Sequence, residues 1–283
     1  MRCIQDVREM REACRTARRE GKTLGFVPTM GGLHAGHASL IERACRECDA
    51  AAISLFVNPT QFGPGEDYGS YPRTWEEDLR LARSLGVDLV FHPDVAEMYP
   101  KGFSTHVEVE RLAAGLCGRH RPGHFRGVAT VVLKLFAVVR PHRAYFGEKD
   151  YQQLVLIRRM VEDLSLEVEV VGCPIVRDPD GLALSSRNAY LNAEERRRAL
   201  ALHRGLGRAR SLLAAGERRA AALEAAAREE LEREGLRVDY ASVVHPDTLE
   251  PLERVEAPAR MAVAAWVGRA RLIDNCPLDP PQG

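Results

Sequence analysis

Residues 26–41 read FVPTMGGLHAGHASLI, and the rest of the architecture can be worked out from this stretch. The apolar run at residues 24–27 is typical of a buried strand, and apolar residues at helical spacing, starting with Leu40 and Ile41, follow it. Between them, Gly31 and Gly32 let the backbone approach a ligand closely because they carry no Cβ. A strand, a glycine turn and a helix start present unpaired backbone N–H groups to an anion. The stretch therefore predicts a nucleotide-binding turn.

His34 and His37 stand at the start of this predicted helix, where a phosphate would bind. Each imidazole can donate a hydrogen bond and can carry positive charge if an anion raises its pKa. A metal site is a second interpretation, but zinc needs three or four ligands and no nearby Cys or His pair completes the set. We therefore expect no metal held by side chains. Ordinary polar residues of a turn are a third interpretation, and this stretch alone leaves it open.

Composition sets broad limits on the class of protein. The 283 residues are 45% hydrophobic and 28% charged, as in most globular proteins. Zero formal net charge argues against nucleic acid or a membrane as partner, because those surfaces need a basic excess. No apolar run approaches the roughly 20 residues that span a bilayer, and the N-terminus lacks a signal-peptide core. Seven irregularly spaced cysteines suggest reduced thiols, so we expect a cytoplasmic protein.

Strands and helices alternate along the first part of the chain. Hydrophobic patterning predicts a helix at residues 7–20, with Thr74 and Glu77 as a capping box at the start of a later helix. The predicted strands are 24–27, 51–57, 87–91, 144–146 and 168–171, and the helices between them are 36–47, 74–85, 128–139 and 151–164. This alternation predicts an α/β fold with a Rossmann-like doubly wound parallel sheet, whose glycine-rich loops share one edge.

The pattern changes after Val176. Two helices rich in alanine and arginine, at 192–214 and 217–234, precede alternating runs at 238–244 and 261–267 that are typical of antiparallel strands. We therefore expect a Rossmann-like catalytic domain at residues 1–176 and a smaller α+β lid domain at residues 177–283. Residues 277–283 are expected to be a frayed tail.

Polar side chains gather in loops that follow the predicted strands. The loops are 28–37, 58–61, 147–153 and 184–188, and Arg126 lies in a fifth predicted loop, 121–127. Their histidines, lysine, arginines, serines and amides suit a polyanion together with a small carboxylate. Paired carboxylates are scarce, which argues against glycosidase or aspartic-protease chemistry.

Several motifs carry a resemblance to known families. HAGH at 34–37 resembles the His-x-Gly-His signature of the nucleotidyltransferase superfamily, which includes class I aminoacyl-tRNA synthetases, and LSSRN at 184–188 resembles its mobile phosphate-binding motif. More specifically, the chain resembles the pantothenate synthetases over nearly its whole length, in order. The segments are PTMG at 28–31, FVNPTQF at 56–62, RPGHFRGV at 121–128, FGEKDYQQL at 146–154, LALSSRN at 182–188 and RLIDN at 271–275.

The resemblance implies an ATP-dependent ligase. Pantoate attacks the α-phosphorus of ATP to give pantoyl adenylate and pyrophosphate, and the amine of β-alanine then attacks the acyl carbon, releasing AMP and pantothenate. Mg2+ accompanies ATP, and a homodimer is expected. Two alternative functions compete with this one. The first is a plain adenylyltransferase that stops at a nucleotide product, and the second is an RNA-binding relative of the synthetases. The RNA-binding relative needs a basic face with exposed aromatics, which zero net charge and 6% aromatic residues do not favour.

The resemblance also assigns roles to individual residues. The expected catalytic residues are His37, His34, Lys149 and Arg187. ATP is expected to contact Met30, Gly31, Gly32, Leu33, His34, Ala35, Gly36, His37, Gly147, Glu148, Lys149, Asp150, Val176, Leu184, Ser185, Ser186 and Arg187. Pantoate is expected to contact Gln61, Gln153, Arg126 and Tyr71, with Gln61 also at β-alanine.

Physical chemistry supports parts of this assignment. Neutral amides can hold the pantoate carboxylate while leaving it nucleophilic, whereas a bidentate arginine would occupy both oxygens. Simpler interpretations stay open for three residues: Lys149 as a surface lysine paired with Glu148 or Asp150, Arg126 as half of a surface salt bridge, and Tyr71 as a packed aromatic.

Overall fold

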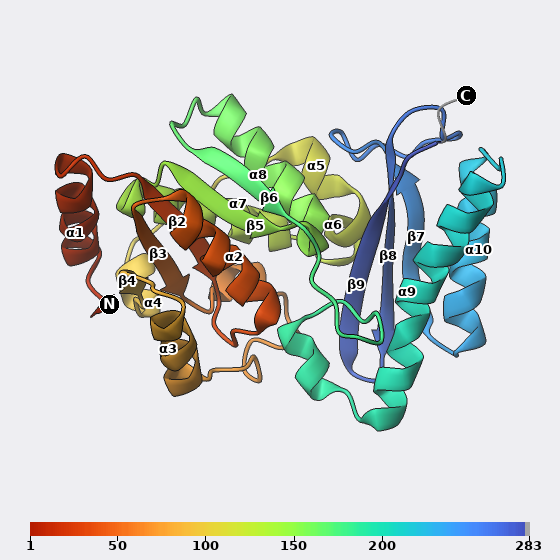
Figure 1. Cartoon of the computed structure of the whole chain (residues 1–283), viewed down its shortest axis with the longest axis horizontal. Coiled ribbons are helices and arrows are strands. Elements are labelled where there is room, and N and C mark those ends of the chain that lie inside the picture. Colours follow the sequence, from red (N-terminus) through yellow and green to blue (C-terminus); the bar gives the residue numbers. More distant parts are fainter. Residues whose placement is uncertain (281–283) are drawn as a thin grey trace. The chain divides into compact units, whose positions relative to one another are not determined.

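A six-stranded sheet in which every neighbouring pair of strands is parallel forms the centre of the first part of the chain (Figure 1). Its order is β1-β4-β3-β2-β5-β6. The central strands β2 and β3 are apolar and almost wholly buried, as a sheet covered on both faces requires. The predicted Rossmann-like parallel sheet is confirmed, and β1 is an edge strand that no pattern indicated. The strands are β1 Arg2–Ile4, β2 Leu24–Thr29, β3 Ala50–Leu55, β4 Leu89–Phe91, β5 Arg143–Gly147 and β6 Glu169–Cys173.

Helices cover this sheet. α2 (Ala35–Glu47) and α3 (Trp75–Ser84) enclose a hydrophobic cluster with the strands, which includes Val27, Ile41 and Ile53. α1 (Val7–Arg19) packs on α7 (His124–Val139), and both contact β2. The remaining elements here are α4 Val95–Met98, α5 Glu110–Ala114, α6 Leu116–His120, α8 Tyr151–Asp163 and the 3-10 turns η1 Pro59–Gln61 and η2 Glu148–Asp150.

The C-terminal part contains a three-stranded antiparallel sheet with two long helices on one face (Figure 1). Asn192 and Glu195 form a capping box at the start of the first helix, and buried leucines and alanines of both helices pack on the sheet. The antiparallel sheet that the pattern predicts is present. The elements are η3 Ser186–Tyr190, α9 Ala193–Ala214, α10 Ala220–Arg233, β7 Arg237–Val244, β8 Ala259–Val267 and β9 Ala270–Leu278.

The expected tail at residues 277–283 is wrong at its start. Pro277 and Leu278 belong to β9, where they pair with Arg260 and Ala259, and Leu278 is fully buried. Leu278 completes the apolar face of the sheet, and proline is tolerated because β9 is an edge strand. The computed structural model describes residues 1–280, so residues 281–283 lie outside it.

Internal contacts group the chain into two compact units. The main division falls between Pro174 and Ile175, close to the expected boundary after Val176. Two earlier segments group with the second unit, which no sequence pattern indicated. The first unit comprises Met1–Ala113, Arg121–Glu148 and Leu156–Pro174; the second comprises Ala114–His120, Lys149–Val155 and the chain from Ile175.

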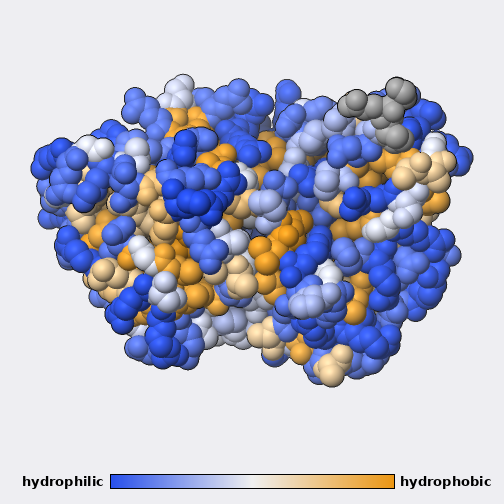
Figure 2. Space-filling model, viewed as in Figure 1, coloured by the Kyte–Doolittle hydropathy of each residue, from blue (hydrophilic) through white to orange (hydrophobic). Residues whose placement is uncertain are grey.

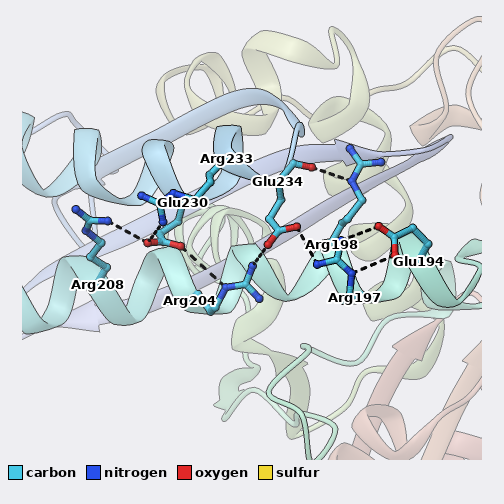
Figure 3. A network of polar contacts seen from close by, with 8 residues as sticks. All are labelled: Glu194, Arg197, Arg198, Arg204, Arg208, Glu230, Arg233 and Glu234. Atoms are coloured by element: carbon cyan, nitrogen blue, oxygen red, sulfur yellow. Dashed lines mark hydrogen bonds and ion pairs between the residues drawn. The ribbon is translucent and has the colours of Figure 1, made fainter.

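Charged residues cover the outer surface of α9 and α10. On the face that Figure 2 shows, hydrophilic residues predominate over these helices. Figure 3 shows that the charges pair across the two helices: Arg204 lies 2.7 Å from Glu234, and Arg208 lies 3.0 Å from Glu230. Such pairs stabilise little individually, but this network joins two elements. No helix within residues 1–280 combines the length and hydropathy needed to cross a bilayer.

Candidate active site

The turn between β2 and α2 places both motif histidines at the N-terminus of α2. His34 is the N-cap residue, and its Nδ1 accepts a hydrogen bond from the backbone N–H of Gly36 at 3.1 Å. The neutral ring therefore carries its proton on Nε2, which makes Nε2 the donor atom of the side chain. The ring centroids of His34 and His37 are 4.2 Å apart. Two imidazoles thus stand side by side at the positive end of a helix dipole.

Three backbone N–H groups of this turn are not open to an anion, contrary to expectation. The N–H of Gly31 donates to Thr29 Oγ1 at 3.2 Å. Those of Gly32 and Leu33 donate to the two carboxylate oxygens of Asp78 on α3, at 3.0 and 2.8 Å. Three of the expected ATP-binding amides are therefore occupied within the protein, and the histidine side chains are the groups of this turn better suited to meet a phosphate.

Asp78 also replaces the expected capping box of α3. Thr74 is the N-cap residue, but its side chain makes no capping hydrogen bond; its hydroxyl donates to Asp78 Oδ1 at 3.1 Å. The predicted pairing of Thr74 with Glu77 is therefore wrong. The hydroxyl of Thr74 is directed instead at the carboxylate of Asp78, which is buried with only 3% of its surface exposed.

The loop after β3 brings Gln61 to the histidine turn. Gln61 is buried, its Nε2 lies 3.1 Å from Met30 Sδ, and its Oε1 accepts from Asn58 Nδ2 at 3.1 Å. Asn58 Nδ2 also donates to the carbonyl oxygen of Gly127 at 3.2 Å. The amide of Gln61 is thus oriented by a second buried amide, with Nε2 as its donor end.

Arg121 and His124, rather than Arg126, lie against Gln61. Arg126 is exposed, because α7 begins at His124 and the predicted loop 121–127 is in fact the first turn of that helix after Gly123. Nη2 of Arg121 and Nδ1 of His124 both bond the carbonyl oxygen of Gln61, at 3.3 and 2.7 Å. The sequence motif RPGHFRGV contains both residues, but neither was assigned a role. Arg121 was missed because single arginines say little in an arginine-rich chain, and no spacing pattern marked His124.

A carboxylate completes this cluster. Glu66 contacts Arg121 at 2.8 Å (Oε1 to Nε) and 2.5 Å (Oε2 to Nη2). Burial opposes ionisation of Glu66, but the hydrogen bonds and charge of Arg121 outweigh burial and hold its pKa below the usual value.

Tyr71, an expected pantoate contact, is buried. Its ring lies edge-on to that of Phe62, with ring centroids 5.9 Å apart.

Three loops of the first unit follow the carboxyl-terminal ends of neighbouring strands, on the same side of the sheet. β3, β2 and β5 are consecutive and parallel, so the loops after them emerge together. These loops carry Gln61, the histidine turn and the end of β5 with Gly147 and Glu148. The expected edge for ligand binding is therefore formed by these segments within the first unit.

The second unit holds the other predicted residues. Lys149 is largely buried, its ammonium lies 3.8 Å from Asp150, and its carbonyl oxygen accepts from Asn275 Nδ2 at 3.0 Å. Asn275 Oδ1 in turn accepts from Arg260, whose guanidinium stacks on Tyr151 at 3.8 Å from the ring centroid. The backbone at Lys149 is thus anchored to β9.

Hydrogen bonds fix the start of the serine loop, residues 184–188, within this unit. The carbonyl oxygen of Val176 accepts from the N–H of Leu184 at 3.0 Å. Arg177 donates twice to the buried carboxylate of Asp274, at 2.6 and 2.9 Å, which ties the loop to β9. Ser185 caps η3 by accepting from the N–H of Arg187 at 3.3 Å.

Comparison with known proteins identifies this arrangement. A sequence model of the family described as Pantoate-beta-alanine ligase matches residues 2–277. The chain belongs to that family.

Relatives of this ligase are similar over their full lengths. Pantothenate synthetase from Thermotoga neapolitana is 55% identical over 276 residues, which is 97% of this chain and 99% of the relative. The crystal structure of the Thermus thermophilus enzyme has 52% identity and a TM-score of 0.94, covering 99% of this chain and 100% of the other. The enzyme from Francisella tularensis, solved with beta-gamma ATP and beta-alanine, has 34% identity and a TM-score of 0.82, covering 98% and 97%.

The resemblance seen in the sequence is therefore confirmed, as is the enzyme class: the chain is a ligase of the pantoate–β-alanine type. In this ligase the described residues, 1–280, contain no group of three or more His, Cys, Asp and Glu placed to hold a metal ion. The predicted site residues divide between the units. The first unit carries residues 30–37, Gln61, Tyr71, Arg126, Gly147 and Glu148; the second carries Lys149, Asp150, Gln153, Val176 and residues 184–187.

Proposed function

We propose that this chain joins pantoate to β-alanine in two steps, through a pantoyl adenylate formed from ATP. Membership of the ligase family supports the overall reaction, and the adjacent His34 and His37 at the start of α2 are the observation that carries the chemistry. In the first step a carboxylate oxygen of pantoate bonds to the α-phosphorus and pyrophosphate leaves. In the second, the β-alanine amine bonds to the acyl carbon and AMP leaves.

The histidines act on the charge that builds up at the α-phosphate. The tautomer of His34 places a proton on Nε2, and His37 stands 4.2 Å away, ring to ring. The helix end contributes about 0.3–1 kcal/mol, and up to about 2 kcal/mol when sheltered. A preorganised donor aimed at developing charge is worth about 10²–10³ in rate. We assign His37 and His34 this role.

Gln61 orients pantoate in this proposal. Because Asn58 fixes Oε1 as acceptor, Nε2 is the end that can donate to the pantoate carboxylate or hydroxyl. Glu66 balances the charge of Arg121. The carboxylate of pantoate therefore faces the neutral amide of Gln61 and stays nucleophilic. Gln153, Tyr71 and Arg126 are proposed to contact pantoate as well, and Gln61 to contact β-alanine.

Residues of the second unit are proposed to bind the same nucleotide. Lys149, Ser186 and Arg187 are suited to the β- and γ-phosphates as an ammonium, a hydroxyl and a guanidinium, and Asp150 to a ribose hydroxyl. The hydrogen bond from Asn275 to the backbone of Lys149, and the ion pair of Arg177 with Asp274 near the base of the serine loop, support a defined presentation of these groups. Gly31, Gly32 and Leu33 are proposed to line the ATP site although their N–H groups are already paired. The remaining expected ATP contacts are Met30, Ala35, Gly36, Gly147, Glu148, Val176, Leu184 and Ser185.

The second unit is further proposed to act as a lid, because the adenylate must be kept from water. Small-angle scattering of the full chain, with and without a non-hydrolysable pantoyl-adenylate analogue, tests this: a smaller radius of gyration with the analogue supports a lid, and an unchanged one contradicts it.

Three accompanying features belong to the proposal. Mg2+ accompanies ATP, since phosphate oxygens are the ligands that Mg2+ prefers. The chain works as a homodimer, which sedimentation velocity can test, and it works in the cytoplasm.

One assay tests the reaction itself. Purified protein with ATP, Mg2+, pantoate and β-alanine should form equal amounts of AMP and pantothenate, and His37→Ala should lose most of this activity. A plain adenylyltransferase would instead release a nucleotide product with no dependence on β-alanine. Absence of pantothenate from the wild-type protein would overturn the proposed function.

A further inference from the structure

The carboxylate of Asp78 binds two backbone N–H groups of the histidine turn and one hydroxyl at the start of its own helix. It is 3% exposed, and its two oxygens accept from the N–H of Gly32 at 3.0 Å, the N–H of Leu33 at 2.8 Å and the hydroxyl of Thr74 at 3.1 Å. Asp78 lies in the first turn of α3, whereas Gly32 and Leu33 lie in the segment just before the N-terminus of α2. A side chain from one helix therefore supplies hydrogen-bond partners to the backbone that leads into another.

The turn and the carboxylate fit each other closely. Gly31 and Gly32 have φ of +86° and +62°, two left-handed residues in succession, which turn the following N–H groups toward α3. A Cβ on Gly31 would lie 3.0 Å from Asp78 Oδ2, so the carboxylate rests against the bare Cα. Without Asp78, two backbone N–H groups in a half-buried turn would lose their partners.

The position of this turn sets the position of the histidines. Leu33 is bonded directly to His34, whose backbone is extended and whose Nδ1 is already committed to Gly36. With Nδ1 held, the direction of Nε2–H follows the backbone of the turn. A shift of about 1 Å at a catalytic donor can cost about 100-fold in rate.

A negative charge near a phosphate site is normally unfavourable, and the contacts of Asp78 offset it. Both oxygens point at donors, and the first turn of α3 adds the positive end of a helix dipole.

We propose that Asp78 is a positioning residue of the ligase reaction: through Gly32 and Leu33 it holds the turn that aims His34 and His37 at the nucleotide. The inference rests on the proposed function for its kinetic effect. Its structural effect is independent of that function.

Asp78→Asn tests the proposal. The amide keeps the size of the side chain but turns one acceptor into a donor, so one backbone N–H, of Gly32 or Leu33, faces another donor. The turnover number of adenylate formation, measured as pantoate-dependent exchange of pyrophosphate into ATP, should fall about 10–100-fold, with little change in KM for pantoate. Thr74→Val removes only the hydroxyl contact and should give a smaller loss of the same kind, and it serves if Asp78→Asn does not fold.

Asp88→Asn is the matched control. Asp88 Oδ2 also accepts a backbone N–H, that of Ala51 at 2.8 Å, but it lies just before β4, at the opposite end of the strands from the histidine turn. This variant should lower the unfolding temperature while leaving the turnover number unchanged.

A second readout does not need activity. In 15N-edited NMR spectra the amide protons of Gly32 and Leu33 should lie downfield in the wild type and move upfield in Asp78→Asn, and the imidazole resonances of His34 and His37 should shift with them. If the wild type makes no pantothenate but these shifts occur, the proposed function fails and the positioning role survives. Wild-type turnover in Asp78→Asn, or unchanged histidine resonances, would overturn the role of Asp78.

Discussion

Arg121 and Glu66 form a two-point ion pair, with Nε 2.8 Å from Oε1 and Nη2 2.5 Å from Oε2. The other donors of Arg121 reach Gln61 O at 3.3 Å and His124 Nε2 at 3.0 Å. Because a carbonyl only accepts and a guanidinium only donates, His124 carries its proton on Nδ1. The cluster neutralises an arginine and uses it to fix the backbone of Gln61.

Arg121→Lys should raise KM for pantoate about tenfold. Lysine keeps the charge but cannot reproduce the planar fork that joins Glu66, His124 and Gln61. Steady-state kinetics at saturating ATP and β-alanine measure the effect. Arg159→Lys, on the exposed face of α8 and paired there with Glu162, is the control and should leave KM unchanged. An unaltered KM in Arg121→Lys would show that Gln61 keeps its place without this cluster.

The same ion pair predicts a pH dependence of stability. Arg121 lowers the pKa of Glu66 below its ordinary 4.5, so the unfolded chain binds the proton more readily than the folded one. The stabilisation is therefore complete above pH 4.5 and is lost as pH falls through the folded pKa. Urea unfolding of the wild type and Glu66→Gln should give free energies that differ at neutral pH and converge in acid. A difference that persists in strong acid would contradict this sign.

Gly127→Ala should destabilise the protein and disturb pantoate binding together. An added Cβ would lie 2.3 Å from the carbonyl oxygen of Thr60 and 2.7 Å from the N of Gln61, so α7 and η1 would have to separate. Overpacking of this kind typically costs about 1–3 kcal/mol. Gly207→Ala in α9 has open space around its Cβ and should instead stabilise by about 0.5–1 kcal/mol. Thermal unfolding and KM for pantoate check both, and a Gly127→Ala protein as stable as wild type would be incompatible with this packing.

His34→Asn should separate helix capping from catalysis. Asparagine is a good N-cap residue, so the free energy of unfolding should stay within about 0.5 kcal/mol of wild type, while the turnover number falls about 100-fold with the loss of the Nε2–H donor. His34→Ala should lose activity and, in addition, about 1 kcal/mol of stability. Equal stability of the two variants would mean that the contact with Gly36 contributes nothing.

Glu230→Gln should lower the melting temperature by about 2 °C in low salt. The difference in melting temperature between this variant and the wild type should vanish at about 1 M NaCl. Arg233 and Arg208 contact Glu230 at 2.7 and 3.0 Å, and they lower its pKa, the hydrogen bond from Arg233 first (Figure 3). Glu256→Gln is the control, because its partner Arg254 lies in the same loop. A difference that does not respond to salt would point to packing rather than charge.

Much of the fold could be predicted from the sequence because burial leaves local patterns. The apolar runs of β2 and β3, the helical spacing in α2 and the capping box of Asn192 and Glu195 are each encoded within a few residues. The ligase family could be predicted because short motifs lie in a fixed order. The edge strands β1 and β9 were not predicted. β1 is only three residues long, and β9 runs into a proline-rich end.

The parallel sheet, the histidine turn and the ligase family can all be inferred from the order of residues along the chain. Which polar groups meet depends on how the chain packs. Packing pairs the amides of Gly32 and Leu33 with Asp78, 45 residues or more along the chain. It also places Arg121 at Gln61, while Arg126 is exposed. This division arises because hydrophobic periodicity is a local property of the chain, whereas the partner of a buried donor depends on which distant surfaces come together.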